Sequence, residues 1–400
     1  MTMEIQEPDK IKENEFALLN LGFRVFFLAA GIFAAISVSY WSAIYLFKFS
    51  FNLTTINSFQ WHSHEMVYGY SLAVISGFLL TAVKNWTGIN TVSGKPLMLL
   101  FLLWCTARIL FLLGSEYILA ASIFDIAFTL TLLAAISYPV FKVKQWKQAP
   151  ILLIVFLLLI FNSIFYLGVY NIVNNGINSG IYAGLYLVIG LILVMGRRVV
   201  PFFIERGVGY KVTLFNSKWL DILIVALYVS FFISELLGLS TVFIAYVTLA
   251  LFVTNCIRLI GWYTKGIWNK SLLWSLYLAL WFISLGFLFV FLNYSFGLSK
   301  YMAIHAFAYG GIGVITMGMM SRVALGHTGR DISKPSKWIS LALALLVLGT
   351  VCRVLMPLFE IASYSLWVGI SQILWVVAFS IFSLVYFPIL TKPRVDSQLG

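Results

Sequence analysis

Long apolar runs recur along the whole chain, and each is long enough to cross a hydrocarbon layer about 30 Å thick. Hydrophobic residues make up 62% of the sequence and charged residues 10%, which excludes an ordinary soluble domain. Breaks in hydropathy predict twelve spans, near residues 19–47, 61–83, 96–114, 117–140, 150–172, 179–200, 218–238, 240–262, 271–293, 299–321, 338–358 and 363–390. We therefore predict an all-α polytopic membrane protein with one transmembrane domain over residues 19–390, between tails at 1–18 and 391–400.

The distribution of lysine and arginine predicts the orientation of these spans. When the sides alternate from a cytoplasmic N-terminus, nearly all loop cations fall on the inner side, and only Lys48 and Lys300 fall on the outer side. This asymmetry follows the positive-inside rule, so both termini are expected in the cytoplasm. Topology also accounts for the net charge of +12, and no nucleic-acid partner is expected; the expected surroundings are the lipid bilayer.

Only four histidines occur in the chain, and three are predicted near the outer face. His62 and His64 open the second span, His305 lies in the outer part of the tenth, and His327 follows the tenth on the inner side. Imidazole is costly to bury in hydrocarbon and is a common metal ligand. We expect an intramembrane haem site at the outer histidines, with copper as an additional candidate. The alternative is that these imidazoles form hydrogen bonds and bind no metal.

Helical geometry limits how the histidines can be shared. His62 and His64 point about 200° apart around a helix, so one could bind haem and the other copper, and the sequence does not choose the axial ligand. His305 and His327 are roughly 33 Å apart if the helix is continuous, so they are not expected to share a metal. Without a C-x-x-C-H motif, the haem would be held non-covalently.

Several residues near His305 could serve the same cofactor. Tyr309 lies one turn further along, and Gly310 and Gly313 could let a flat group approach the backbone. Arg353 is expected at the same depth, where its partner would be a haem propionate or Glu360.

Two other intramembrane charges have local explanations. Arg108 is expected to form an ion pair with Asp125 on the adjoining span. Glu65 could orient an imidazole as a hydrogen-bond acceptor.

A second, inner site could form around Arg322, His327 and Arg330, with Arg197 and Arg198 on the same side. These groups could hold an anion or the propionates of a second haem. An inner-loop staple without a ligand is the structural alternative.

The segments that carry the histidines resemble the NnrS family of bacterial membrane proteins. The resemblance runs the full length and includes Gly22-Phe23-Arg24, Trp61-His62-Ser63-His64-Glu65-Met66, Met195-Gly196-Arg197-Arg198, His305-Ala306 and Gly326-His327-Thr328-Gly329-Arg330. It implies a b-type haem, an association with copper, and resistance to nitric oxide in the bacterial inner membrane.

A more distant likeness is to the core subunits of haem–copper oxidases and nitric oxide reductases, which have twelve spans in three four-helix arcs. Their low-spin haem is held by histidines of helices 2 and 10, as the outer histidines here would allow. The sixth and seventh spans contain no histidine, so the dinuclear centre of that superfamily cannot be built.

These observations favour a haem protein that protects against nitrosative stress, by binding nitric oxide or by passing electrons to or from a redox partner. A haem-dependent oxidoreductase activity stays open. The alternatives are a twelve-span transporter, with a proton and substrate path through buried charges, and a factor that delivers haem or copper.

Overall fold

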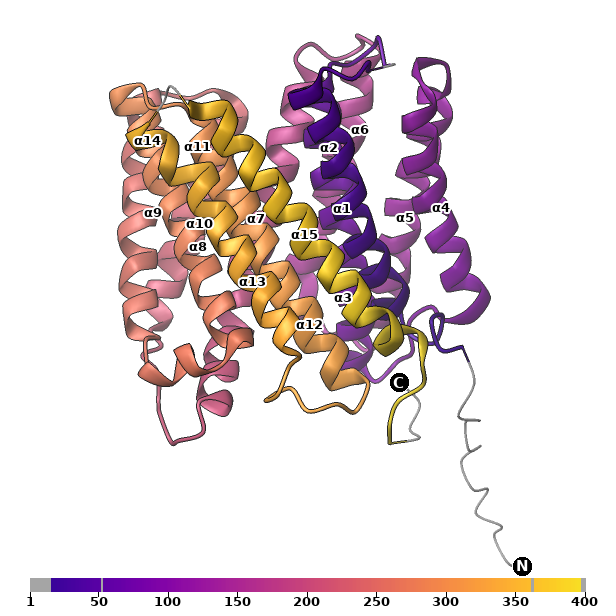
Figure 1. The fold of residues 1–400 in the computed structure, drawn as a ribbon, viewed down its shortest axis with the longest axis vertical. Coiled ribbons are helices and arrows are strands. Elements are labelled where there is room, and N and C mark those ends of the chain that lie inside the picture. Colours follow the sequence, from indigo (N-terminus) through magenta and orange to yellow (C-terminus); the bar gives the residue numbers. More distant parts are fainter. Residues whose placement is uncertain (1–15, 52, 361–362, 397–400) are drawn as a thin grey trace, which may run out of the picture.

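A computed structural model describes residues 16–51, 53–360 and 363–396, and within these ranges the chain is helical with no strand. Twelve helices are long and apolar enough to cross a membrane (Figure 1). The predicted fold class and the number of spans are therefore confirmed.

The spans are built as follows. The first four are α1 (Gly22–Phe47); α2 (Ser58–His64) with η1 (Glu65–Ser71) and α3 (Leu72–Thr87); α4 (Gly94–Leu113); and η2 (Ser115–Tyr117) with α5 (Ile118–Lys142). The next four are η3 (Trp146–Gln148) with α6 (Ala149–Val169); α7 (Gly176–Gly207); α8 (Lys218–Leu237); and α9 (Thr241–Gly261). After η4 (Lys265–Asn269) come α10 (Ser271–Phe296); α11 (Lys300–His305) with η5 (Ala306–Gly313) and α12 (Val314–His327); α13 (Lys337–Thr350) with η6 (Val351–Leu355) and α14 (Met356–Phe359); and α15 (Tyr364–Thr391).

The sixth and tenth spans extend further at their C-terminal ends than predicted. They end at Gly207 and His327, where residues 200 and 321 were expected. In both spans the hydropathy falls at the first basic residues near the C-terminal end. The backbone hydrogen bonds of the helix continue past these residues. Apolar length therefore marks the hydrocarbon crossing and not the end of the helix.

Contacts between the helices group the spans into three sets of four. The eleventh, twelfth, first and second spans form one set, the third to sixth a second, and the seventh to tenth a third. Each set ends on one of the second, sixth and tenth spans, and these three meet one another in the interior. The arrangement agrees with the three arcs that the sequence suggested.

Three spans contain a π-helical segment, in which the backbone hydrogen bonds reach one residue further than in an α-helix. These segments are η1 in the second span, η5 in the tenth and η6 in the eleventh. In η1, the Ser71 hydroxyl donates to the carbonyl of Met66, five residues earlier, at 2.8 Å. This carbonyl oxygen in the widened turn thereby gains a hydrogen-bond donor. Each π segment contains or directly follows a histidine or arginine proposed from the sequence.

The two ends of the described chain lie on the same face of the bundle. Ala17 N–H donates to the Thr391 carbonyl at 2.8 Å. Arg24 donates to the carbonyls of Leu390 at 3.0 Å and Lys392 at 2.8 Å. Helices α1 and α15 pack along each other (Figure 1), so the last span closes the bundle against the first.

Candidate functional site

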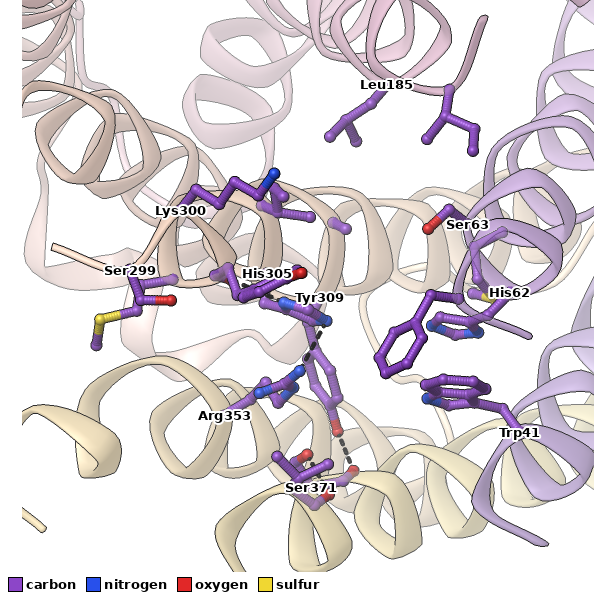
Figure 2. Close-up of a pocket in the computed structure, with 18 of the residues that line it drawn as sticks. Trp41, His62, Ser63, Leu185, Ser299, Lys300, His305, Tyr309, Arg353 and Ser371 are labelled. Carbon is purple, nitrogen blue, oxygen red and sulfur yellow. Dashed lines mark hydrogen bonds between the residues drawn. The ribbon is translucent and has the colours of Figure 1, made fainter. Parts of the chain in front are cut away.

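A cavity of about 1250 Å³ opens in the end of the bundle away from the chain termini. It is lined by residues of the first, second, sixth, tenth, eleventh and twelfth spans and by the end of the ninth, and the lining includes His62, His305, Tyr309 and Arg353 (Figure 2). Ligand pockets usually measure about 300–1,000 Å³, so there is room for a large organic cofactor. The central spans thus create the space, and the π segments lie around it.

His305 is the last residue of α11 and is held in one tautomer by its two partners. Its Nδ1 lies 2.8 Å from the Tyr301 carbonyl, which can only accept, so Nδ1 carries the proton. Its Nε2 lies 3.1 Å from Arg353 Nη2, which can only donate, so Nε2 carries the lone pair. A neutral imidazole fixed in this way is suited to metal binding through Nε2.

His62 faces the same cavity from α2 (Figure 2). A capping box starts this helix: Asn57 accepts from Gln60 N–H at 2.9 Å, and the Gln60 side chain accepts from Asn57 N–H at 2.9 Å. The ring of His62 stacks on Trp41 with centroids 4.7 Å apart and planes at 9°. Its Nδ1 is buried and has no hydrogen-bond partner among the described residues, which is unusual for a buried polar atom.

The charged side chains that line the cavity are all cations. Arg353 donates to the Tyr364 hydroxyl at 2.8 Å as well as to His305, and Lys300 lies over the rings of Tyr182 and Tyr301 at 5.7 and 5.8 Å. The lining residues in the described chain include no Asp or Glu. The alternative partner of Arg353, Glu360, accepts instead from Ser363 at 2.7 Å. The cavity therefore favours an anionic ligand.

The glycines after His305 have another role than the one suggested by the sequence. A Cβ at Gly310 would lie 2.6 Å from Thr350 and 2.7 Å from Phe282, and one at Gly313 would meet the ring of Trp375. These positions let neighbouring helices approach and do not open onto the cavity. Tyr309 does line the cavity, and its hydroxyl donates to the Ser371 carbonyl at 2.7 Å.

His64 lies on the other face of the second span, inside a buried polar network. Its Nδ1 is 3.0 Å from Glu65 Oε1, and its Nε2 is 3.0 Å from Asn162 Oδ1 and 3.6 Å from Asp125 Oδ2. The ring packs parallel to Phe111 at 5.0 Å. The structure thus separates His64 from His62 and His305, which share the cavity.

Arg108 completes this network and confirms the ion pair predicted with Asp125. It also donates to Glu65 at 2.6 Å, while Asn162 and Tyr166 each donate to the other Asp125 oxygen at 2.9 Å. Glu65 contacts an imidazole, as the sequence suggested, and that imidazole is His64. Every charge here has an opposite partner, which buried ions require.

The residues proposed for an inner site each have a partner of their own. Arg322 lies 3.9 Å over the Phe203 ring, Arg197 pairs with Asp221, and Arg198 donates to Gln148 at 2.8 Å. Arg330 reaches the Thr328 carbonyl at 3.5 Å, and the His327 ring lies 5.6 Å from that of Phe23. Arg394 donates to the His327 carbonyl at 3.2 Å, which agrees with the staple alternative. Across residues 16–51, 53–360 and 363–396, no group of three His, Cys, Asp or Glu side chains is placed to hold a metal ion.

The comparison with protein families covers all of these residues. The family model described as NnrS protein matches residues 17–394. The chain belongs to the NnrS family. No individual curated protein matches it.

Two features of the cavity in this NnrS-family chain were not predicted. Trp41 lies twenty-one residues before His62 in sequence. The sequence offers no reason to assign Trp41, and not a tryptophan of another span, to the cavity. The charge distribution indicates only that Lys300 lies in an outer loop, although its position five residues before His305 is a signal that could place it at the cavity. The π segments leave no pattern in hydropathy, because they change hydrogen bonding and not residue type.

Proposed function

We propose that this chain is a haem-binding protein of the bacterial inner membrane, with both termini in the cytoplasm, that protects the cell against nitric oxide. The observation that carries the proposal is the pairing of His62 and His305 across one large cavity whose charged side chains are cations. Membership of the NnrS family supports the link to nitric oxide.

The residues of the cavity fit a non-covalently bound haem. His62 and His305 would be the ligands of the iron, and Arg353 and Lys300 would hold the two carboxylates of the macrocycle. Aromatic side chains such as Trp41, Tyr309 and Trp375 supply flat apolar surfaces. When bound, haem supplies an iron that binds nitric oxide or transfers an electron.

The surrounding groups act by orienting these ligands. The Tyr301 carbonyl fixes the proton of His305 on Nδ1, and stacking on Trp41 fixes the plane of His62. The Tyr364 hydroxyl holds the guanidinium of Arg353 at the edge of the cavity. The histidine tautomer and ring planes are therefore set by the protein before any cofactor enters.

The other functions considered from the sequence have less support. A transporter would need unpaired ionisable groups along a path, but Asp125 and Glu65 are both paired with Arg108. Copper lacks a set of three donor side chains in the described residues. A haem delivery factor would use the same cavity and would differ in how readily it releases the haem.

The visible spectrum of the purified protein tests the proposal. We expect a Soret band in the wild type, and its near-complete loss in His305→Ala while membrane insertion is unchanged, because the alanine removes an iron ligand. The conservative cavity variant Ser63→Ala is the control and should keep the band. Wild-type protein reconstituted with haemin but lacking the band, or His305→Ala with full haem content, would refute the proposal. A shift of the band with nitric oxide would distinguish gas binding from electron transfer.

A further inference from the structure

Arg353 donates a hydrogen bond to the one atom of His305 that could bind a metal. The Nδ1 proton is committed to the Tyr301 carbonyl, so only Nε2 has a free electron pair. Arg353 Nη2 donates to this Nε2 at 3.1 Å. A metal cannot reach the lone pair until the guanidinium has moved.

Arg353 is also held in this position by a second hydrogen-bond partner, from the twelfth span. Its Nη1 donates to the Tyr364 hydroxyl at 2.8 Å, and the neighbouring Cys352 and Val354 are buried in the helix packing. No carboxylate of the described residues lies within ion-pair distance of it, because the seven ion pairs of the described chain all involve other residues. Any ligand with an anionic group would therefore offer this guanidinium an ion pair that it does not form with the described residues.

We propose that Arg353 makes the cavity selective for a metal carried inside an anionic ligand and excludes bare divalent cations. A bare cation would meet a fixed positive charge at the lone pair of His305. A ligand with a carboxylate offers Arg353 a new partner, so the guanidinium swings away and Nε2 becomes available. The inference deepens the proposed function and rests on it only for the identity of the anionic ligand as haem.

Lys300 provides a matched comparison within the same cavity. It is also a cation, but its ammonium lies over the rings of Tyr182 and Tyr301 and makes no hydrogen bond to His305. Loss of either cation should weaken the binding of an anionic ligand. Only the loss of Arg353 should open His305 to a bare metal ion.

The experiment measures the binding of Cu²⁺ and of haemin separately, on the purified full-length chain freed of haem. Electron paramagnetic resonance reports Cu²⁺ bound to imidazole nitrogen, and the Soret band reports haemin. We expect Arg353→Met to bind Cu²⁺ about tenfold to a hundredfold more tightly than the wild type, which corresponds to one hydrogen bond to a charged group. The same variant should bind haemin more weakly. Arg353→Lys, which keeps the charge, should continue to exclude Cu²⁺, and Lys300→Met should lose haemin affinity without gaining Cu²⁺.

The outcomes separate this inference from the proposed function. Equal Cu²⁺ affinity in the wild type and Arg353→Met, or an equal gain in Lys300→Met, would overturn the role of Arg353. A gain of Cu²⁺ in Arg353→Met alone, with no haemin binding in any variant, would uphold selectivity against bare cations and refute haem as the ligand. If Arg353→Met does not insert, Tyr364→Phe replaces it: loosening the guanidinium should raise Cu²⁺ affinity by a smaller factor, and no rise would count against the proposal.

Discussion

Two histidines that are two residues apart have opposite surroundings in this molecule. His62 lines the cavity and has a buried nitrogen without a partner among the described residues, whereas both nitrogens of His64 contact side-chain oxygens. Helical geometry predicted that they point to different faces. Which face would be the cavity could not be predicted, because that depends on Trp41, Asn162 and Asp125, which other spans supply.

Alanine variants of the two histidines should therefore differ in kind. We expect His62→Ala to lose most of the haem with little change in thermal stability, since its buried Nδ1 has no hydrogen-bond partner among the described residues. His64→Ala should keep the haem but lower the melting temperature, because Glu65 Oε1 and Asn162 Oδ1 then each lose a buried hydrogen-bond partner. Soret absorbance and thermal unfolding of the same samples measure both effects. Loss of haem in His64→Ala at unchanged stability would reverse the assignment.

The ion pair of Arg108 and Asp125 should be among the most important polar contacts for stability. Asp125 is fully buried and also accepts from Asn162 and Tyr166. We expect Asp125→Asn to lower the free energy of unfolding by about 3–5 kcal/mol, because it breaks a buried charge pair and its hydrogen bonds. The exposed carboxylate Asp331 gives the control, and Asp331→Asn should change stability by less than about 0.5 kcal/mol. Similar melting temperatures for both variants would contradict the prediction.

At the level of helices, the positions of the spans could be predicted and their internal irregularities could not. A stretch of apolar residues long enough to cross the bilayer is visible in sequence, so all twelve spans were found. The π segments η1, η5 and η6 depend instead on which neighbouring helix presses on each turn. Gly310 and Gly313 illustrate this, because their closest contacts are Thr350, Phe282 and Trp375 from three other spans.

The close approach at Gly310 leads to a prediction about helix packing. In Gly310→Ala the added methyl would lie 2.6 Å from Thr350 Cγ2 and 2.7 Å from Phe282 Cβ, so the tenth span must shift. We expect a loss of about 1–3 kcal/mol, measured by thermal or denaturant unfolding. Gly196→Ala is the matched control, since its methyl would meet only Leu280 at 3.6 Å, an ordinary contact. Equal stabilities of the two variants would show that the tenth span yields without strain.

For the molecule as a whole, the charge distribution predicts an orientation in the membrane, but it does not predict which contacts the cations of the predicted inner side make. The count of Lys and Arg on each side requires only the sequence. The partners of Arg197, Arg198 and Arg322 come from distant segments, namely Asp221, Gln148 and Phe203. The sequence therefore predicts that these basic residues lie on one side of the molecule. It does not predict that each of them contacts a different local partner.

The length of the tenth span keeps its two histidines apart. Residues Lys300–His327 form one continuous crossing through η5, so His305 and His327 lie at opposite ends. We expect His327→Ala to leave the Soret band of the wild type unchanged in position and intensity. The same loss of the band in His305→Ala and in His327→Ala, in correctly inserted protein, would mean that both side chains serve one iron.

The packing of α15 along α1 has a consequence for how the protein is made. The surface that covers α1, and the carbonyls of Leu390 and Lys392 to which Arg24 donates, are synthesised only after the eleven preceding spans. One flank of the first span must therefore stay uncovered by this chain until α15 has been inserted. A chain truncated before Tyr364 lacks α15 and leaves this flank of α1 open, so we expect it to be degraded faster than the chain that contains α15.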